Sequence, residues 1–331
     1  MVTVIIPTYK RARYITRAID SVLGQTYDDF EIIVVDDNSP NTKEREDLEK
    51  QMEKYKDNSK VIFIQHEKNK NGSVARNTGI QMAKGEYITF LDDDDFYLKD
   101  RLKILTQALD NNEKYDAVYS GGVILYKDIF EANVSGNFQK NILKRQTFLK
   151  TGSNMFFRAK AIKDINGFDE SFIRLQDLEV MARFFRKYEI LAINKILVVK
   201  DYSDRINELN VNMEKEIKIR EHYLKTFQDD INKYDDKNDI IQSNYVELLI
   251  KASKMKDKKY YNILKEKVLE YGNINFKLKL KLILYNMFKN DIYIKIKAKL
   301  QELSVKIRIE MLDKNISKEI KDIVKEYNVE E

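Results

Sequence analysis

The sequence predicts an α/β fold: a mostly parallel sheet flanked by helices and followed by a helical C-terminal region. Three observations predict it. Strand-like and helix-like patterns alternate over the first hundred residues, acidic turn residues follow two of the strands, and Pro and Gly almost disappear after about residue 208. Alternation of this kind is typical of a doubly wound, Rossmann-like sheet. Ligand sites in such sheets lie at the carboxyl ends of the strands.

Four short apolar runs are the expected strands. The first, Val2–Ile6, is closed by Pro7, and the second, Phe30–Val35, leads into the turn residues of 36–39. The other two are Val61–Ile64 and Glu86–Leu91. Apolar residues at helical spacing between these runs predict helices over about 14–23, 44–55 and 73–84, with glycines near two of their ends.

The change of composition divides the chain into an α/β part, residues 1–207, and a helical region, 208–331. Within the second part, 276–282 and 292–300 are basic and apolar together. Their alternation favours strands, whereas Leu, Lys and Ala favour helix, so the sequence leaves this choice open. A basic amphipathic surface can rest on anionic lipid. The preferred alternative is a helical appendage or a contact between copies of the chain.

The composition excludes several classes of function. The 331 residues include no cysteine and two histidines, which excludes thiolate chemistry and argues against a histidine zinc site or a Ser-His-Asp triad. No apolar run approaches the roughly 20 residues of a membrane span, and no signal peptide is evident, so we expect a cytoplasmic protein. The net charge of +5 is modest and its basic residues are interleaved with acids, so we expect no nucleic-acid partner.

Four consecutive carboxylates, 92–95, follow the strand that ends at Leu91. Adjacent anions repel one another, so a folded chain keeps them only where water or a cation lowers the cost. Carboxylates at this edge of a sheet suit Mg²⁺ or Mn²⁺, which bridge to phosphate oxygens. The alternative is a solvated acidic turn. The position behind a strand, together with the motifs below, favours the metal site.

Five motifs occur in a fixed order along the first part. They are Val4-Ile-Ile-Pro-Thr-Tyr-Lys-Arg11, Ala18-Ile-Asp-Ser-Val-Leu-Gly-Gln-Thr-Tyr27, Glu31-Ile-Ile-Val-Val-Asp-Asp-Asn-Ser39, Gly72-Ser-Val-Ala-Arg-Asn77 and Gly85-Glu-Tyr-Ile-Thr-Phe-Leu-Asp-Asp-Asp-Asp95. Over residues 1–205 the chain resembles the family-2 glycosyltransferases of the GT-A fold. The resemblance implies a metal-dependent, inverting transferase of the hexosyl or N-acetylhexosaminyl class that uses a nucleotide-diphospho-sugar, most often a UDP-sugar. Residues 1–97 then form the nucleotide-sugar half of a catalytic domain and 98–207 its acceptor side.

The resemblance also implies roles for particular donor-side residues. Pro7, Thr8 and Tyr9 would line the nucleotide pocket. Asp37 would accept the N3–H of uracil with Asp36 beside it, and Arg76 would lie near the base or the diphosphate. Asp92 would reach the ribose or the metal, and Asp94 would be the principal metal ligand. The fourfold repeat leaves the register open by one residue, so Asp93 and Asp95 stay candidates. Ser153 and Asn154 would lie near the donor sugar.

An inverting transfer needs a general base for the acceptor hydroxyl. In the family this carboxylate follows a Gly-Phe-Asp-Glu segment, which is present here as 167–170. Asp177 is therefore the expected base, with Glu179 as the second choice, although Gln176 stands where the family usually has Glu. A histidine that many relatives place near the end of the domain has no counterpart in 201–207.

The resulting hypothesis is a transferase that adds a single sugar in bacterial surface polysaccharide, lipid-linked glycan or glycoprotein synthesis. The chain has no Trp, so it lacks the Gln-X-X-Arg-Trp motif of processive relatives. The C-terminal region would contact the inner face of the plasma membrane or a second copy. Two alternatives remain: a catalytically silent scaffold of the same fold, and a sugar nucleotidyltransferase, which should carry a Gly-rich loop after its first strand.

Overall fold

The computed structural model describes the chain except for residues 202–211, 275–278, 280–281, 283–290 and 328–331, and except for the side chains of 291–298. The described chain divides into two compact units. One comprises Met1–Asn137, Phe148–Ser203 and Gln301–Glu331, and the other comprises Phe138–Thr147 and Asp204–Leu300. The boundary expected after residue 207 lies outside the described residues and stays a prediction. The ambiguous basic segment 276–282 also lies largely outside them.

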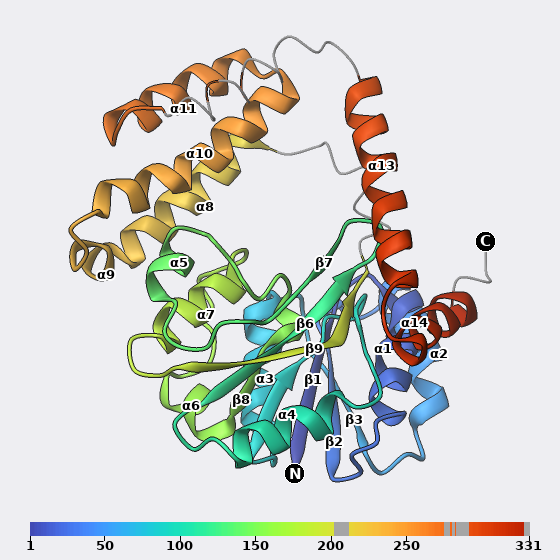
Figure 1. Ribbon diagram of the computed structural model, residues 1–331. Coiled ribbons are helices and arrows are strands. Elements are labelled where there is room, and N and C mark those ends of the chain that lie inside the picture. The colour runs from blue at the N-terminus through green and yellow to red at the C-terminus, as the bar shows by residue number, and fades with distance from the viewer. Residues whose placement is uncertain (202–211, 275–278, 280–281, 283–290, 328–331) are drawn as a thin grey trace. The chain divides into compact units, whose positions relative to one another are not determined.

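Strands and helices alternate over the first ninety residues, which confirms the predicted order. The elements are β1 (Val2–Thr8), α1 (Ala12–Leu23), β2 (Phe30–Asp36), α2 (Lys43–Met52) with the short helix η1 (Glu53–Tyr55), β3 (Val61–Gln65), α3 (Gly72–Met82) and β4 (Tyr87–Phe90). These strands pair in parallel in the order β3-β2-β1-β4. Their carboxyl ends, and the loops that follow, therefore meet at one edge of the sheet (Figure 1).

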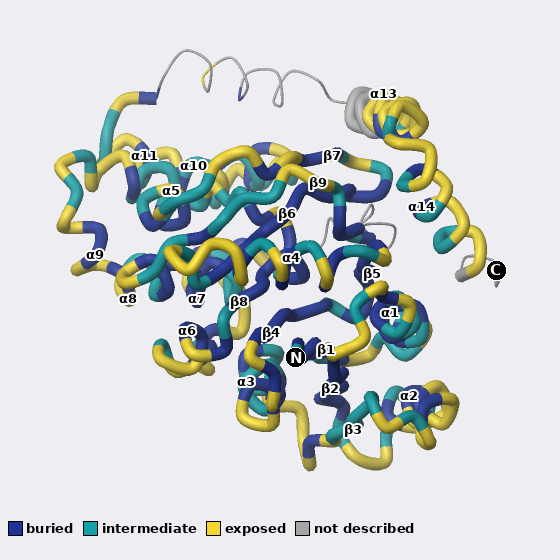
Figure 2. The backbone as a smooth tube through the Cα atoms, turned by 60° about the horizontal axis from the view of Figure 1, so that its bottom comes forward, coloured by how far each residue is buried: buried dark blue, intermediate teal, exposed yellow. Residues whose placement is uncertain are grey.

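Both faces of this sheet are covered, as its uninterrupted apolar runs predict. Val4 and Val34 face a core that includes residues of α1 and α2, whereas Ile33 and Val35 pack with Ala75 of α3 on the opposite face. The close approach of α3 depends on Gly79, because a Cβ there would lie 2.4 Å from the Ile5 side chain. In Figure 2, β1 and β2 are coloured as buried along their length.

The first strand is longer than the sequence suggests. Pro7 does not close β1, which continues to Thr8 with Pro7 in register with Val35 of β2. Pairing with β4 on the other side of β1 already ends at Ile5. A proline, which has no N–H to donate, is tolerated where a strand has lost one neighbour. The extra residues carry Thr8 to the edge where the polar loops meet.

The later strands complete a mixed sheet, and among the described residues they supply all the antiparallel pairs. The elements are β5 (Phe96–Tyr97), α4 (Arg101–Asp110), β6 (Ala117–Ile124), β7 (Asp128–Phe130), α5 (Gln139–Leu143), η2 (Gly152–Asn154), β8 (Phe156–Arg158), α6 (Ala159–Asp164), α7 (Gln176–Phe184) and β9 (Ile190–Lys200). The sheet order continues β4-β8-β6-β9-β5, with β7 on β6. The predicted α/β class is confirmed.

The C-terminal region is helical, as predicted. Its described helices are α8 (Met213–Thr226), α9 (Gln228–Asn232), α10 (Lys237–Met255), α11 (Lys258–Glu270), α13 (Asp291–Glu310) and α14 (Lys314–Tyr327). α8, α10 and α11 share an apolar core of their own around Leu248 and Leu264. Val305, Ile309 and Ile320 of the last two helices instead pack with the sheet residues Val123 and Val199. No helix among the described residues is long and apolar enough to cross a membrane.

Candidate active site

The aspartates after β4 form a short loop whose carboxylates alternate in their partners. Asp92 and Asp94 contact arginines: Arg76 Nη2 lies 2.6 Å from Asp92 Oδ1, and Arg11 Nη1 donates to Asp94 Oδ2. Arg76 comes from α3, and Arg11 is the residue before α1. The first and third carboxylates of the run therefore face cationic groups from two different elements.

The second and fourth carboxylates accept hydrogen bonds from neutral hydroxyls instead. Thr8 Oγ1, at the end of β1, donates to Asp93 Oδ2 at 2.7 Å. Thr151 and Ser153 donate to Asp95 Oδ2 at 2.7 and 2.5 Å. Burial, and then the neighbouring Asp94 carboxylate, raises the pKa of Asp93 to about 8 and that of Asp95 to about 7. Without a cation, these two groups therefore hold protons more strongly than an ordinary aspartate.

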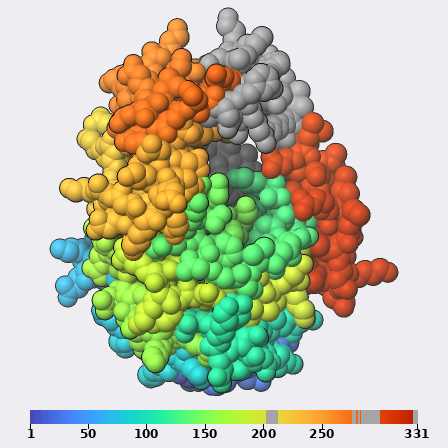
Figure 3. Space-filling view, turned by 60° about the vertical axis from the view of Figure 1, so that its left-hand side comes forward, coloured from blue at the N-terminus to red at the C-terminus, as the bar shows by residue number. Residues whose placement is uncertain are grey.

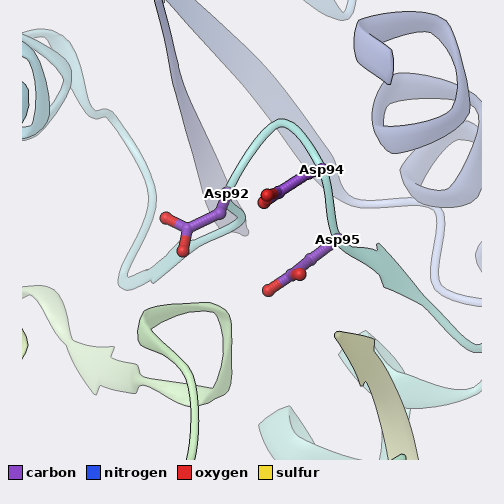
Figure 4. A group of neighbouring side chains, drawn as sticks. All are labelled: Asp92, Asp94 and Asp95. Atoms are coloured by element: carbon purple, nitrogen blue, oxygen red, sulfur yellow. The ribbon is translucent and has the colours of Figure 1, made fainter. Parts of the chain in front are cut away.

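Three of the four carboxylates are close enough to share one ion. Asp92, Asp94 and Asp95 each offer an oxygen, and these oxygens lie within 4.8 Å of one another. Figure 4 shows the three side chains, which all come from one loop. An all-oxygen, acidic and largely buried donor set suits a hard divalent cation such as Mg²⁺ or Mn²⁺. The residues present thus fit a metal, and Asp95 joins the two expected ligands as a third candidate.

A buried arginine fixes the backbone of this loop. Arg17 of α1 is 1% exposed; its Nη2 donates to the carbonyl oxygen of Asp94 at 2.6 Å, and its Nη1 lies 2.8 Å from Asp201 Oδ2. The backbone N–H of Asp201 in turn donates to Asp95 Oδ1. The helix after β1, the aspartate loop and the residue after β9 are therefore held together. No sequence pattern marks Arg17, because its partners are distant in the chain.

The aspartates after β2 have a different environment. Asp37 is buried, and both of its oxygens accept hydrogen bonds from the loop before α3: the backbone N–H groups of Lys70 and Asn71 at 2.8 and 2.9 Å, and the Asn69 amide at 2.8 Å. His66 Nδ1 lies 2.8 Å from Asp37 Oδ1. Asp37 therefore organises this loop. Its expected contact with uracil stays a prediction.

Both carboxylate oxygens of Asp36 also contact other residues of the protein. Arg45 of α2 lies 2.7 Å from Asp36 Oδ2, and Asn38 donates to Oδ1 through both its backbone and its side chain at 2.8 Å. Burial raises the pKa of Asp36. Neither Asp36 nor Asp37 belongs to the carboxylate group that can hold a metal.

Two of the expected pocket residues lie beside Thr8. Tyr9 is exposed, and Pro7 is partly exposed. The backbone N–H of Lys10 donates to Asn38 Oδ1, which ties this turn to the loop after β2. An exposed aromatic ring beside the aspartate loop can stack on a nucleobase.

Ser153 and Asn154 lie in η2 and are buried. Ser153 Oγ accepts a hydrogen bond from the backbone N–H of Asp92 in addition to donating to Asp95, so it belongs to the aspartate loop. Asn154 instead bonds Ser120 and the buried Arg101. The structure therefore brings Ser153, and not Asn154, to the carboxylate group.

Asp177 and Glu179 lie in the first turn of α7 but face different surroundings. Asp177 is partly exposed, and its Oδ1 accepts a hydrogen bond from the backbone N–H of the neighbouring Leu178. Glu179 is fully buried, pairs with Arg183 and accepts the backbone N–H of Asp169. Glu179 thus holds the turn before α7, whereas Asp177 is accessible to solvent.

Gln176 connects this helix to the aspartate loop. Arg76 Nη1 donates to Gln176 Oε1 at 2.8 Å while its Nη2 contacts Asp92. Arg76 therefore bridges the candidate metal ligand and the residue next to the expected base. Gln176 leaves the charge of Arg76 uncompensated on this side, whereas a Glu would neutralise it.

The chain matches one family model and several known proteins. The family model described as "Glycosyl transferase family 2" matches residues 3–165. A Staphylococcus aureus relative named poly(ribitol-phosphate) beta-N-acetylglucosaminyltransferase TarP is 30% identical over 238 residues, covering 63% of this chain and 70% of that protein.

Solved structures share the fold. S. aureus TarS 1–349 in complex with UDP-GlcNAc aligns with a TM-score of 0.53 and 18% identity over 83% of this chain and 93% of that one. The mannosyltransferase PcManGT from Pyrobaculum calidifontis, in complex with GDP-Man and Mn²⁺, aligns with a TM-score of 0.51 and 14% identity over 88% of each chain.

Proposed function

The chain belongs to glycosyl transferase family 2 and is a glycosyltransferase, and from this we propose that it transfers one sugar from a nucleotide-diphospho-sugar to an acceptor hydroxyl by a metal-dependent, inverting reaction. The observation that carries the proposal is the group of three carboxylate oxygens within 4.8 Å of one another. It lies beside Arg76, which also donates to Gln176, the residue before the partly exposed Asp177, so a candidate cation site and a further positive charge are linked to the segment that carries the candidate base.

On the donor side, Asp92 and Asp94, with Asp95, would hold Mg²⁺ or Mn²⁺. A bound cation at this position neutralises the charge that develops on the leaving nucleoside diphosphate. Arg76 would contact the diphosphate, and the exposed Tyr9 with Pro7 and Thr8 would line the nucleotide pocket. A UDP-sugar is the proposed donor, supported by the TarS complex with UDP-GlcNAc, while the Mn²⁺ in PcManGT supports the choice of ion.

On the acceptor side, Asp177 would take the proton of the attacking hydroxyl. The acceptor oxygen then forms a bond to the anomeric carbon as the bond from that carbon to the diphosphate oxygen breaks. Attack from the face opposite the leaving group inverts the anomeric centre. Asp177 suits this role better than Glu179, because Glu179 is fully buried on Arg183.

The acceptor is proposed to be a surface polysaccharide, a lipid-linked glycan or a glycoprotein. A glycan-like acceptor agrees with the name of the TarP relative. Single addition is expected, because no tryptophan is present to form the motif of processive enzymes.

We assign a membrane-facing role to α13. Leu303 and Ile307 of α13, with Met311 directly after it, form an exposed apolar row. This row lies on the side of the helix opposite the buried Val305 and Ile309. Figure 2 colours the described part of α13 largely as exposed, and Figure 3 shows the last helices in red at the surface. The sequence of 277–308 holds nine Lys and Arg against two acids. An apolar row with a basic approach suits the anionic inner face of a plasma membrane.

Co-sedimentation with vesicles separates this contact from an oligomer. Wild-type protein should sediment with phosphatidylglycerol vesicles and much less with phosphatidylcholine vesicles, and Leu303→Glu with Ile307→Glu should abolish the difference. A dimer that these substitutions dissolve, without any vesicle binding, would show that a second copy covers the row.

Release of the nucleotide tests the proposed transferase activity. We expect purified protein with Mn²⁺ to release UDP from one member of a panel of UDP-sugars, and Asp177→Asn to slow transfer to acceptor while UDP still binds. No release and no metal-dependent nucleotide binding would favour the silent scaffold. Release of pyrophosphate from a sugar phosphate and UTP would instead indicate a nucleotidyltransferase.

A further inference from the structure

Arg11 lies between β1 and α1, and its guanidinium contacts a carboxylate of the metal group. Its Nη1 donates to Asp94 Oδ2 and lies 3.9 Å from Asp93 Oδ1. The Asp94 side chain is buried, whereas 30% of the Arg11 side chain is exposed. Arg11 is also the residue before α1 but makes no side-chain cap there, so its guanidinium is not needed to hold the helix end.

Arg17, on the same helix, shows the contrast. Its guanidinium is fully buried and contacts the backbone oxygen of Asp94 and the carboxylate of Asp201. Arg17 therefore fixes where the loop runs. Arg11 instead contacts the side-chain carboxylate of Asp94, one of the three that could hold a metal, and its own side chain is partly exposed.

A divalent cation and this guanidinium compete for Asp94. A cation bound through Asp92, Asp94 and Asp95 would lie within a few ångströms of the Arg11 side chain, and the two positive charges would repel each other. An arginine that is partly exposed can leave at little cost. Its planar donor group is also suited to two phosphate oxygens at once.

We propose that Arg11 is a displaceable counter-ion of Asp94. Without metal it neutralises this carboxylate; when metal and donor bind, it moves from Asp94 to the diphosphate of the nucleotide-sugar. This assignment rests on the proposed function, since it needs a metal and a diphosphate at the site. It makes Arg11 a donor-binding residue that contacts Asp94 of the aspartate loop, whereas Arg76 contacts Asp92.

The proposal predicts effects of opposite sign for metal and nucleotide. In Arg11→Ala, Mn²⁺ alone should bind about tenfold more tightly, because a neighbouring opposite charge changes the occupancy of a carboxylate by this order. UDP in saturating Mn²⁺ should bind about tenfold more weakly, because a charged hydrogen bond to the diphosphate is lost. A merely structural arginine would weaken both.

Free Mn²⁺ is measured by electron paramagnetic resonance in titrations at pH 8. UDP binding in saturating Mn²⁺ is measured by calorimetry. Arg11→Lys, which keeps the charge, should lie between wild type and Arg11→Ala in both. Arg13→Ala is the matched control: it removes one exposed charge in the first turn of α1, where the Arg13 guanidinium lies over the Tyr14 ring, and should change neither affinity more than about twofold.

Each result decides a separate point. Unchanged or weaker Mn²⁺ binding by Arg11→Ala would overturn the competition for Asp94. Unchanged UDP binding would overturn the transfer to the diphosphate, and in both cases the proposed function stands if wild type binds UDP with Mn²⁺. If no form binds Mn²⁺ even with UDP present, the metal-dependent function fails and the role of Arg11 fails with it. Thermal melting of each variant shows that loss of binding is not loss of folding.

Discussion

Two parallel strands of the same sheet end in aspartates, yet the protein treats the two groups differently. After β2, the buried Asp36 accepts hydrogen bonds from Asn38 and forms an ion pair with Arg45, and the buried Asp37 accepts hydrogen bonds from the loop before α3. After β4, Asp92 and Asp94 contact two arginines from different elements, and with Asp95 they form a group that can hold an ion.

We interpret the difference as one between structural carboxylates and ligand-binding ones. The oxygens of Asp37 are used by backbone N–H groups that cannot leave without unfolding a loop. The partners of Asp92 and Asp94 are side-chain cations, which a stronger cation can replace. The sequence pattern, strand then aspartates, is the same in both places, so only the partners reveal the role.

The largest expected effect comes from substitution of Asp94, one of the two aspartates after β4 that contact arginines at short range. Asp94→Asn should reduce kcat/KM about 10³-fold, because the metal loses a ligand where charge develops. Folding stability should change little, since the substitution removes one of four crowded anions. Kinetics with a saturating donor and urea denaturation measure the two quantities. Glu46→Gln, an exposed acid of α2, is the control and should change neither. A large loss of stability with activity retained per folded molecule would reverse the comparison.

The pair on α7 repeats the comparison on a smaller scale. Asp177→Asn should lower kcat about 10²- to 10³-fold and leave the free energy of unfolding unchanged, because a partly exposed general base is lost. Glu179→Gln should instead lower that free energy by about 2–4 kcal/mol, because the partly buried Arg183 then keeps its charge without a carboxylate partner. Equal effects of the two substitutions on kcat would show that the structure does not distinguish base from scaffold.

The third test concerns Asp37, one of the two buried aspartates after β2. Asp37→Asn should lower the free energy of unfolding by about 2–4 kcal/mol, since an amide N–H then faces backbone donors in a buried site. Asp57→Asn, at an exposed position, provides the baseline in the same urea titrations. Wild-type stability in Asp37→Asn, together with lost UDP binding, would identify Asp37 as a ligand contact alone.

The smallest effect is a pH dependence. In the metal-free protein the pKa values of Asp93 and Asp95 are raised to about 8 and about 7, above their value near 4 in the unfolded chain. The folded state therefore binds more protons between these limits, and its stability falls as pH rises from about 4 to 8. Mg²⁺ binding displaces these protons, so the rise in Tm caused by Mg²⁺ should grow from pH 5.5 to 8. Asp95→Asn should flatten this dependence; a rise that is independent of pH in wild type would contradict it.

The sequence predicts the fold well because its strands are apolar runs with clear ends. The βα alternation, the helical C-terminal region and the position of 92–95 behind a strand all follow from local pattern. The prediction that Pro7 closes the first strand is wrong, because whether a strand continues through a proline depends on which neighbouring strands pair with it.

The sequence names candidate site residues but not their contacts. The assignment of Asp92 and Asp94 as the ligands within the run of four stays a prediction; in the structure these two contact arginines at short range, whereas Asp93 and Asp95 accept hydrogen bonds from hydroxyls. Arg11 was visible in the first motif without a role, since no pattern links it to a residue 83 positions away. Arg17 and the Gln176–Arg76 bond are long-range contacts that only the folded chain reveals.

The central claim is that the loop after β4 binds a divalent cation together with the donor nucleotide. Thermal melting with UDP, with Mn²⁺ and with both tests it most directly, because ligands of the native state raise Tm. We predict a rise of several degrees with UDP and Mn²⁺ together, a much smaller rise with UDP alone, and no such difference in Asp94→Asn. An equal rise with UDP in the presence of EDTA, or a full metal response in Asp94→Asn, would contradict it.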